Sequence, residues 1–316
     1  MKNEPLFLQP VFKDRIWGGK KLQMMFDYDI EGNQVGECWA ISAHKNGESI
    51  VMNGVYKGKT LSELWNKNRE LFGHLQGDKF PLLVKILDAN ADLSIQVHPN
   101  DIYANEYENG ELGKTECWYV LDCEEDSELI YGHHAKTKEE LVEMINNKLW
   151  DKLLRKVKIK KGDFFYVPSG TIHALCKGTV VLEVQQSSDT TYRLYDYDRK
   201  DQNGQYRDLH IKQSIDVSTV PFTNTKTSII KKEINSNIIT TLISSEFFTV
   251  KKYEINEAFT CEQINPFCLY SVIEGNGTLE KDGEKYILSK GMHFFLPDKF
   301  GEFVFNGKMT CMVAHV

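Results

Sequence analysis

Hydrophobic positions along the chain come mostly in short runs of Val, Ile, Phe, Tyr and Thr, separated by Gly, Asn and Asp. β-Branched and aromatic residues favour extended backbone. The turn signals between the runs are the pairs Asn53-Gly54, Asn109-Gly110, Asn203-Gly204, Asp282-Gly283 and Asn306-Gly307. Such pairs favour tight hairpin turns. The pattern therefore predicts a mainly β protein with antiparallel strands, built as a sandwich or a barrel.

Two segments in the first half of the chain have the helical spacing of apolar residues instead. One runs from Thr60 to about Leu75, and the other runs from Thr137 to about Leu154. Each begins with a threonine that is followed three residues later by a glutamate, which is the pattern of a capping box. We expect a helix over each segment.

A polar stretch over residues 218–236, rich in Thr, Lys and Asn, separates two parts of the chain. A length of 316 residues agrees with two domains at about 150 residues per domain. We expect the first domain over residues 1–235, which contain the predicted helices. The second is a compact β module over residues 236–316, and it could cover a pocket, support the first domain or mediate association.

Composition and charge exclude several classes of function. Acidic residues outnumber basic ones by 45 to 38, so the net charge of −7 argues against a nucleic-acid surface. No run is long and apolar enough for a membrane span or a signal peptide. The seven cysteines are scattered without a CxxC pair, which is typical of reduced thiols in a cytoplasmic protein. We expect a cytoplasmic protein with no nucleic-acid or membrane partner, and the sequence leaves the oligomeric state open.

The most informative stretch is the alternating segment 93–99, which predicts a strand that ends at Pro99. Alternation places Ser94, Gln96 and His98 on one face, and simple solvent exposure of that face would explain it. The residue types suggest another explanation, because an amide oxygen and an imidazole two residues apart can reach the same metal ion.

Two further stretches carry possible ligands. Lys114 and Glu116 are two residues apart and so lie on one side of a strand, where such a pair is usually a surface ion pair. His173 follows a Pro-x-Gly turn, where a lone histidine is more often structural than a ligand. Together with Gln96 and His98, Glu116 and His173 complete a set of nitrogen and oxygen ligands that suits Zn²⁺, and also Fe²⁺, Mn²⁺ or Co²⁺.

A fourth stretch is dense in charge and begins with a strand that carries Glu183. Asp189 and Arg193 follow it, and Arg193 could pair with Asp189 or with Asp196. It could equally direct a fixed positive charge at an anionic intermediate or a phosphate. The charged run over residues 196–201 has the pattern of a solvated turn.

These stretches resemble the type I phosphomannose isomerase family of zinc-dependent cupins, in its short bacterial subgroup. The matching pieces follow one another in the expected order: Ile16-Trp17-Gly18-Gly19, residues 36–42, residues 93–99, Lys114-Thr115-Glu116, residues 168–173 and residues 183–193. The resemblance implies two jelly-roll-like cupin β barrels, with a few helices inserted in the N-terminal catalytic half.

The resemblance also implies roles for individual residues. It makes Gln96, His98, Glu116 and His173 the ligands of one zinc ion per chain. It makes Arg193 and Lys114 the active-site cations, Glu183 and Asp189 acidic residues of the pocket, and Ser94 and Lys85 residues on the substrate side. His293 has no HxH partner nearby, so we expect the C-terminal cupin to be free of metal.

The activity that the resemblance implies is the interconversion of mannose 6-phosphate and fructose 6-phosphate through an enediol, with a small sugar phosphate as the partner. Two other functions remain open from the residues alone. One is an Fe²⁺ cupin oxygenase, which would need oxygen. The other is a non-catalytic cupin that only binds a sugar phosphate.

Overall fold

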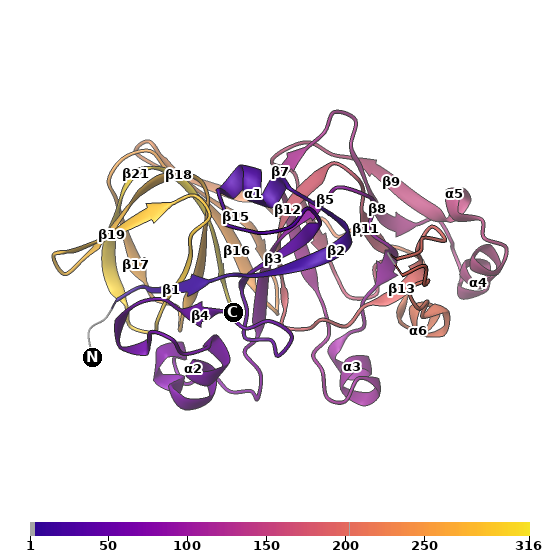
Figure 1. Ribbon diagram of the computed structural model, residues 1–316, viewed down its shortest axis with the longest axis horizontal. Coiled ribbons are helices and arrows are strands. Elements are labelled where there is room, and N and C mark those ends of the chain that lie inside the picture. The colour runs from indigo at the N-terminus through magenta and orange to yellow at the C-terminus, as the bar shows by residue number, and fades with distance from the viewer. Residues whose placement is uncertain (1–3, 202) are drawn as a thin grey trace.

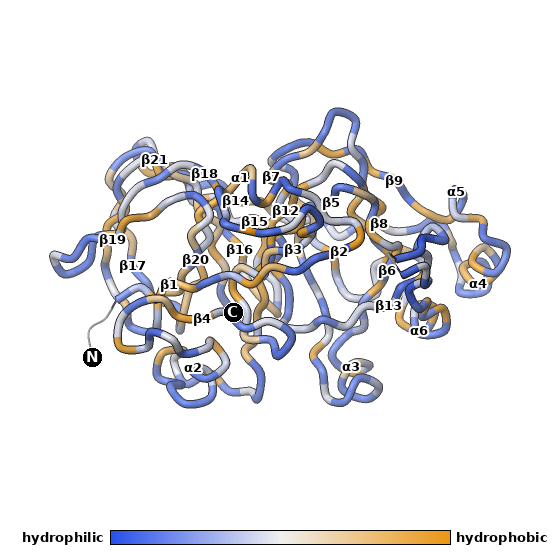
Figure 2. The backbone as a smooth tube through the Cα atoms, viewed as in Figure 1, coloured by the Kyte–Doolittle hydropathy of each residue, from blue (hydrophilic) through white to orange (hydrophobic). Residues whose placement is uncertain are grey.

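The structure is a computed structural model that describes residues 4–201 and 203–316. Three antiparallel sheets form most of it, and Figure 1 shows them as two lobes side by side. The prediction of a mainly β, antiparallel protein is confirmed. The apolar segments in Figure 2 follow the strands, whereas the connecting loops are mostly hydrophilic.

The C-terminal lobe is one ten-stranded sheet that curls into a barrel (Figure 1). Its strands are, in spatial order, β14 (Ile230–Ile234), β15 (Asn237–Ser244), β16 (Thr249–Ile255), β21 (Gly301–His315), β18 (Cys268–Lys281), β20 (His293–Leu296), β1 (Leu6–Gln9) and β4 (Ile50–Val51), with β17 (Phe259–Gln263) beside β21 and β19 (Glu284–Ser289) beside β18. Strands β1 and β4 therefore belong to the C-terminal barrel although they come from the start of the chain. The expected division after residue 235 stays a prediction.

Two sheets face one another in the other lobe. The six-stranded sheet contains β10 (Phe164–Val167), β7 (Glu116–Cys123), β12 (Thr179–Gln186), β5 (Leu82–Ala89), β3 (Val35–Ile41) and β2 (Val11–Gly19), in that order. The five-stranded sheet contains β13 (Tyr192–Tyr195), β6 (Ile95–Val97), β11 (His173–Leu175), β8 (Glu128–His133) and β9 (Leu154–Lys158).

All of the described helices lie between residues 21 and 217. They are α1 (Lys21–Phe26), the 3₁₀ turn η1 (Gly54–Tyr56), α2 (Leu61–Lys67), the 3₁₀ turn η2 (Arg69–Phe72), α3 (Asp101–Tyr107), α4 (Lys138–Asn146), α5 (Trp150–Leu153) and α6 (Ile211–Val217). Helix α2 begins with the predicted capping box at Thr60. At the second helix the box is only half formed, because the Glu140 carboxylate accepts a hydrogen bond from the backbone N–H of Lys136 and not of Thr137.

Both predicted helices are also shorter than expected, and each ends at a break in the backbone. Asn68 has extended φ, so α2 is followed by the separate turn η2. Lys148 adopts a left-handed φ of 53°, so α4 is separated from α5. The sequence pattern did not reveal these breaks, because the pieces on both sides of each break bury apolar side chains against the sheets. The helical spacing of apolar residues therefore continues past the end of each helix.

Apolar clusters separate the layers and place the six-stranded sheet in the middle. Val84 and Leu182 lie on one face of this sheet and pack in the cluster that includes Phe267 and Phe295 of the C-terminal barrel. Leu87 and Val181 lie on the other face and pack in the cluster shared with the five-stranded sheet. A third cluster joins the outer face of the five-stranded sheet to the helices α4 and α5. Strands β5 and β12 are therefore buried along their whole length.

Candidate active site

Three candidate residues lie in one row across the five-stranded sheet. His173 on β11 is paired with Gln96 on β6, and Gln96 is paired with Arg193 on β13. Residues directly opposite in antiparallel strands point to the same face. The neighbouring residues Ile95 and Val97 pack toward the helices, so this row faces the six-stranded sheet.

The polar face of the segment 93–99 is buried, and the explanation by solvent exposure is wrong. Ser94 and His98 are 3% and 1% exposed, and Gln96 between them is half-buried. The regular strand is also shorter than predicted, because β6 covers only Ile95–Val97. Both faces are covered because one lies against the six-stranded sheet and the other against the helices.

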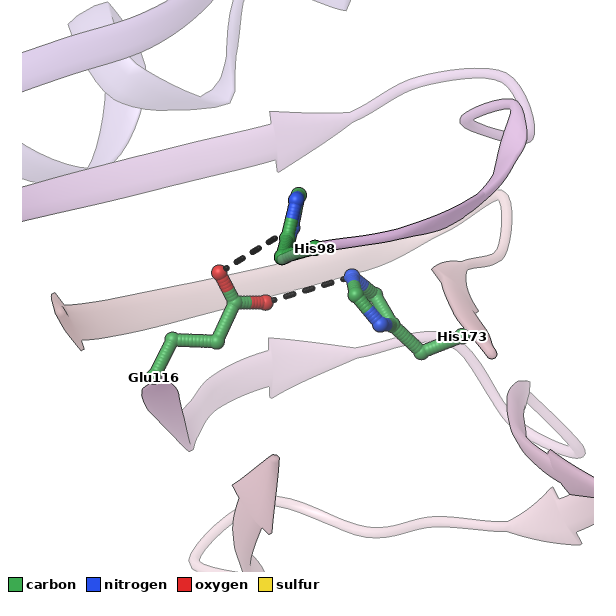
Figure 3. Close-up of side chains that lie close together, drawn as sticks. All are labelled: His98, Glu116 and His173. Carbon is green, nitrogen blue, oxygen red and sulfur yellow. Dashed lines mark ion pairs between the residues drawn. The ribbon is translucent and has the colours of Figure 1, made fainter. Parts of the chain in front are cut away.

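His98, Glu116 and His173 form a compact buried group (Figure 3), the only such group of potential metal ligands among the described residues. The Glu116 carboxylate, at the start of β7, lies between the two rings. Its Oε2 is 3.4 Å from Nε2 of His98, and its Oε1 is 3.3 Å from Nε2 of His173. One ligand atom from each residue lies within 4.8 Å of the others. This is the geometry of a candidate metal site.

The backbone sets the orientation of both rings. Nδ1 of His98 lies 2.9 Å from the carbonyl oxygen of Thr190, and Nδ1 of His173 lies 2.8 Å from that of Thr171. Each Nδ1–H therefore donates to a carbonyl, which leaves the lone pair of Nε2 directed at Glu116. Burial lowers the pKa of His98 well below its ordinary value and that of His173 to about 4, so both rings are neutral at pH 7.

The residues at this point fit a metal ion. Nε2 of His173 and Oε1 of Glu116 are buried without a hydrogen-bond partner. A neutral imidazole lone pair and a carboxylate oxygen repel one another at 3.3 Å unless a positive charge lies between them. A divalent cation would satisfy both atoms at once, and the nitrogen and oxygen donors suit zinc and its neighbours.

Lys114 supplies part of the positive charge. Its ammonium group contacts Oε2 of Glu116 and lies 3.0 Å from Nε2 of His98. Although burial acts to lower the pKa of Lys114, Glu116 and then Glu183 raise it above its ordinary value. The ammonium is therefore charged at pH 7. Both side chains are buried, so the interpretation of Lys114 and Glu116 as a surface pair is wrong.

A cavity of about 460 Å³ lies beside this group. It is lined by Asp14, Arg15, Ile16, Trp17, Glu37, Lys85, Leu87, Leu93, Ser94, Gln96, Lys114, Glu183, Asp189, Thr191, Arg193, Arg207 and His210. The structure thus brings together every candidate site residue, since those that do not line the cavity are His98, Glu116 and His173, which contact Lys114 or neighbour Gln96.

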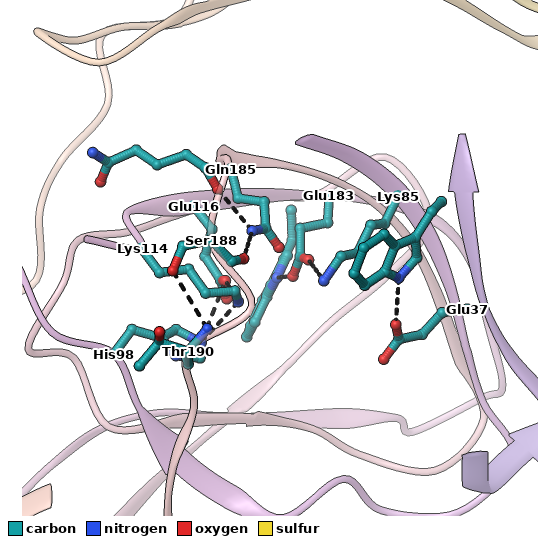
Figure 4. A network of polar contacts seen from close by, with 12 residues as sticks. Glu37, Lys85, His98, Lys114, Glu116, Glu183, Gln185, Ser188 and Thr190 are labelled. Carbon is teal, nitrogen blue, oxygen red and sulfur yellow. Dashed lines mark hydrogen bonds and ion pairs between the residues drawn. The ribbon is translucent and has the colours of Figure 1, made fainter. Parts of the chain in front are cut away.

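Glu183 is held between two groups in the wall of the cavity (Figure 4). Its Oε2 accepts a hydrogen bond of 2.8 Å from Nε1 of Trp118, and its Oε1 is 3.7 Å from the ammonium of Lys85. Burial, followed by the charge of Glu116, raises the pKa of Glu183. A carboxyl group with a raised pKa is better suited to exchange protons near neutral pH.

Arg15 and Glu37 were not among the predicted site residues, although Glu37 lies within the matching piece 36–42 and Arg15 directly precedes the piece that begins at Ile16. Arg15 donates two hydrogen bonds to Glu37, of 2.8 and 3.0 Å, and Nε1 of Trp39 donates a third of 2.6 Å. Burial acts to raise the pKa of Glu37, but Lys85 and Arg15 together lower it. Glu37 is therefore an ionised carboxylate whose oxygens are occupied.

Arg193 has neither of the carboxylate partners that the sequence suggested. Asp196 pairs with Arg199 and Arg207, and Asp189 accepts a hydrogen bond from the side chain of Asn46. Arg193 itself donates to the carbonyl oxygen of Asp208, at 2.9 Å. Among the described residues no carboxylate forms an ion pair with Arg193, so its charge is available to the cavity.

Two other histidines are buried in places unrelated to this group. His133 is the last residue of β8, and its Nε2 lies 2.9 Å from the carbonyl oxygen of Thr219. His293 lies in the C-terminal barrel between Ser271 and Tyr28, at 2.9 and 2.8 Å. As for the membrane, none of the helices that the structure describes has the length and apolar character needed to cross one.

Comparison with protein families gives two matches. Residues 6–122 match the phosphomannose isomerase type I catalytic domain, and residues 238–316 match the mannose-6-phosphate isomerase cupin domain. The second match covers most of the C-terminal barrel and confirms the expected cupin fold.

Individual relatives match along the whole chain. The chain is 56% identical over 316 residues to the mannose-6-phosphate isomerase ManA of Bacillus subtilis, with 100% of both covered. It is 52% identical to the mannose-6-phosphate isomerase of Streptococcus mutans, covering 99% of this chain and 98% of that one. The crystal structure of a mannose 6-phosphate isomerase from Bacillus subtilis superimposes with a TM-score of 0.97 at 52% identity, covering 99% of both chains.

Proposed function

The chain belongs to the type I phosphomannose isomerase family, and we propose that it uses the buried His98–Glu116–His173 group and the adjoining cavity to interconvert mannose 6-phosphate and fructose 6-phosphate. The observation that carries the proposal is the position of this group beside a cavity lined by cations and carboxylates. A substrate with hydroxyl groups and one phosphate matches both parts of the site.

The proposed cofactor is one zinc ion per chain. Nε2 of His98, Nε2 of His173 and the Glu116 carboxylate would hold it, with the amide oxygen of Gln96 as the fourth ligand. When bound, a divalent ion acts as a Lewis acid that polarises the sugar oxygens and stabilises developing negative charge. Donors of nitrogen and oxygen support zinc, since they satisfy the ligand preferences of that ion.

Proton transfer between the two reacting carbons needs a base that can also return the proton. We assign this role to Glu183, because its buried carboxyl has a raised pKa and one oxygen, Oε1, without a Trp118 hydrogen bond. Asp189 is the more exposed acidic candidate and accepts a hydrogen bond from Asn46. It is better suited to bind a sugar hydroxyl group.

The remaining polar side chains bind the substrate or stabilise negative charge that develops on it. Lys114 and Lys85 are buried ammonium groups in the cavity wall, where they stabilise an enediolate oxygen. The hydroxyl of Ser94 lines the same wall and can bind a substrate hydroxyl. Arg193 stays protonated and so acts by its charge, not as a proton shuttle.

The proposal includes a cytoplasmic location. It rests on the unpaired cysteines, which are typical of proteins kept in a reducing compartment.

The test is isomerisation by the purified full chain. We expect conversion of mannose 6-phosphate to fructose 6-phosphate at the same rate with and without oxygen, complete loss of activity on chelation, and recovery with added Zn²⁺. Full activity in a verified metal-free sample would contradict the metal site. Oxygen dependence would indicate an oxygenase, and tight sugar-phosphate binding without turnover would indicate a binding protein.

A further inference from the structure

We propose that Arg207 binds the phosphate group of the substrate and so selects the phosphorylated sugar over the free sugar. The inference deepens the proposed function, on which it rests. It starts from a charged loop after β13 whose beginning, residues 196–201, has the sequence pattern of a solvated turn. In the structure this loop folds back through a bridge between Lys200 and Tyr206. Asp196 at its start is only 5% exposed.

Asp196 holds two arginines at once. Nε of Arg207 donates to its Oδ2 at 2.8 Å, and Nη2 of Arg207 contacts its Oδ1. Nη2 of Arg199 donates to the same Oδ1 at 2.6 Å. One carboxylate therefore faces two guanidinium groups, which leaves a net positive charge. Among the described residues nothing accepts a hydrogen bond from Nη1 of Arg207.

Only one of these two arginines reaches the cavity. Arg207 lines it together with Arg193 and His210, whereas Arg199 instead donates to the carbonyl oxygen of Asp92. Burial and the charge of Arg207 both lower the pKa of Arg193, which places the two guanidinium groups near each other. Arg193 has no ion pair within the described part of the chain, and Arg207 shares Asp196 with Arg199, so the two guanidinium groups present a net positive charge to the cavity.

The other cations of the cavity are less available to a phosphate. Arg15 is bound at Nε and Nη2 by Glu37, as Arg207 is by Asp196, but its Nη1 also donates to the carbonyl oxygen of Asp14, at 3.1 Å. Lys85 lies 3.7 Å from Glu183, and Lys114 contacts Glu116. A phosphate dianion is bound best by guanidinium groups that still have free N–H donors. Arg193 and Arg207 meet that condition.

The arrangement of the strands also matches the length of a hexose phosphate. His173, Gln96 and Arg193 follow one another on adjacent strands, which lie about 5 Å apart. The carbons that exchange oxidation state are at one end of the sugar and must lie near the candidate ligands. The phosphate on the sixth carbon is at the other end, and Arg193 and Arg207 are at that end of the row.

The experiment compares Arg207→Met with Arg199→Met in the full metal-loaded chain. The two variants are matched, because each removes one arginine from Asp196 and leaves the other to neutralise that buried carboxylate. We expect Arg207→Met to raise the KM for mannose 6-phosphate about ten- to a hundredfold, the usual effect of losing a charged hydrogen bond. Arg199→Met should leave KM within about twofold.

Binding of substrate analogues separates phosphate recognition from general damage. Mannitol 1-phosphate and mannitol, which cannot isomerise, are titrated by calorimetry against each protein. Arg207→Met should weaken binding of mannitol 1-phosphate by the same factor as it raises KM, and should leave mannitol unchanged. Arg207→Lys keeps the charge without the planar fork and should give an intermediate loss, so it decides the question if Arg207→Met does not fold.

Two results would overturn the inference. One is an unchanged affinity for mannitol 1-phosphate in a folded Arg207 variant. The other is an equal loss for the phosphorylated and free polyols, or an equal loss in Arg199→Met, since either would give Arg207 a structural role alone. Failure of the proposed function is distinguishable, because it is an absence of isomerisation in the unaltered chain.

Discussion

Removal of one candidate ligand should release the metal, whereas removal of another buried histidine should not. The perturbation is His98→Ala or His173→Ala, each of which deletes a ring whose Nε2 lies 3.3–3.4 Å from Glu116. The matched controls are His133→Ala and His293→Ala. Each deletes a buried ring whose hydrogen-bond partner, the Thr219 carbonyl or the Ser271 hydroxyl, is not part of this group.

The size of the effect follows from sharing the binding energy among the ligands. A four-coordinate zinc site is worth about 10–16 kcal/mol at pH 7, so each ligand contributes on the order of 3 kcal/mol. Loss of that amount weakens binding by roughly a hundredfold or more. The carbonyl groups of Thr190 and Thr171 orient the two rings by hydrogen bonds, so each deletion removes a ligand that is already held in position.

The assay measures metal per chain by elemental analysis after gel filtration, and competition with a coloured chelator gives the relative affinities. Circular dichroism confirms that each variant is folded. We expect close to one ion per chain in the two controls and almost none in His98→Ala and His173→Ala. Equal metal content in all four proteins would refute the assignment of the site.

Two further predictions concern charge. Arg193→Ala should retain the metal and raise the KM for mannose 6-phosphate with little change in kcat, because Arg193 lies at the end of the row that we assign to the phosphate. Arg193→Lys should recover part of that loss. A fall in kcat of about 10²–10³ would place its charge at the enediolate instead, and near-normal kinetics would remove Arg193 from the site. Burial lowers the pKa of His293 to about 3, below its value of about 6.5 in the unfolded chain. As the pH drops below about 6.5, the unfolded state takes up a proton that the folded state does not, so the free energy of unfolding falls. Relative to His293→Gln, the unaltered protein should lose up to about 2 kcal/mol of unfolding free energy between pH 6.5 and pH 5, and a pH-independent difference in urea titrations would contradict this.

Most of the fold and the chemical types at the site could be predicted from local sequence, because turns, caps and alternation act over a few residues. Alternation at Ser94, Gln96 and His98 predicted which side chains share a face, and the register confirms that Gln96 faces His173. Whether a strand face is buried depends on elements that are distant in the sequence. The six-stranded sheet and the helices cover both sides of β6, and no pattern within seven residues contains that information.

The residues that sequence reasoning missed are charged pairs separated widely along the chain. Arg15 and Glu37 are 22 residues apart, and each alone is an ordinary surface residue type. Asp196 begins the run 196–201, which has the composition of a solvated turn, and its partner Arg207 lies beyond that run. Burial is what turns these pairs into parts of a cavity wall, because ion pairs out of water hold their geometry and keep their charge.

The position of the C-terminal barrel argues against one of the roles that the sequence left open for it, covering the pocket, and favours another, support of the first domain. The cavity is lined by residues between Asp14 and His210, so among the described residues the barrel contributes no wall to it. The barrel instead packs on the opposite face of the six-stranded sheet, where Val84 and Leu182 share an apolar cluster with Phe267 and Phe295. That contact buries the back of β5 and β12, the strands that carry Lys85 and Glu183. Two opposite charges can be held 3.7 Å apart in a cavity wall only if their strands do not move. The position of the barrel therefore favours a role in supporting the sheet that carries Lys85 and Glu183.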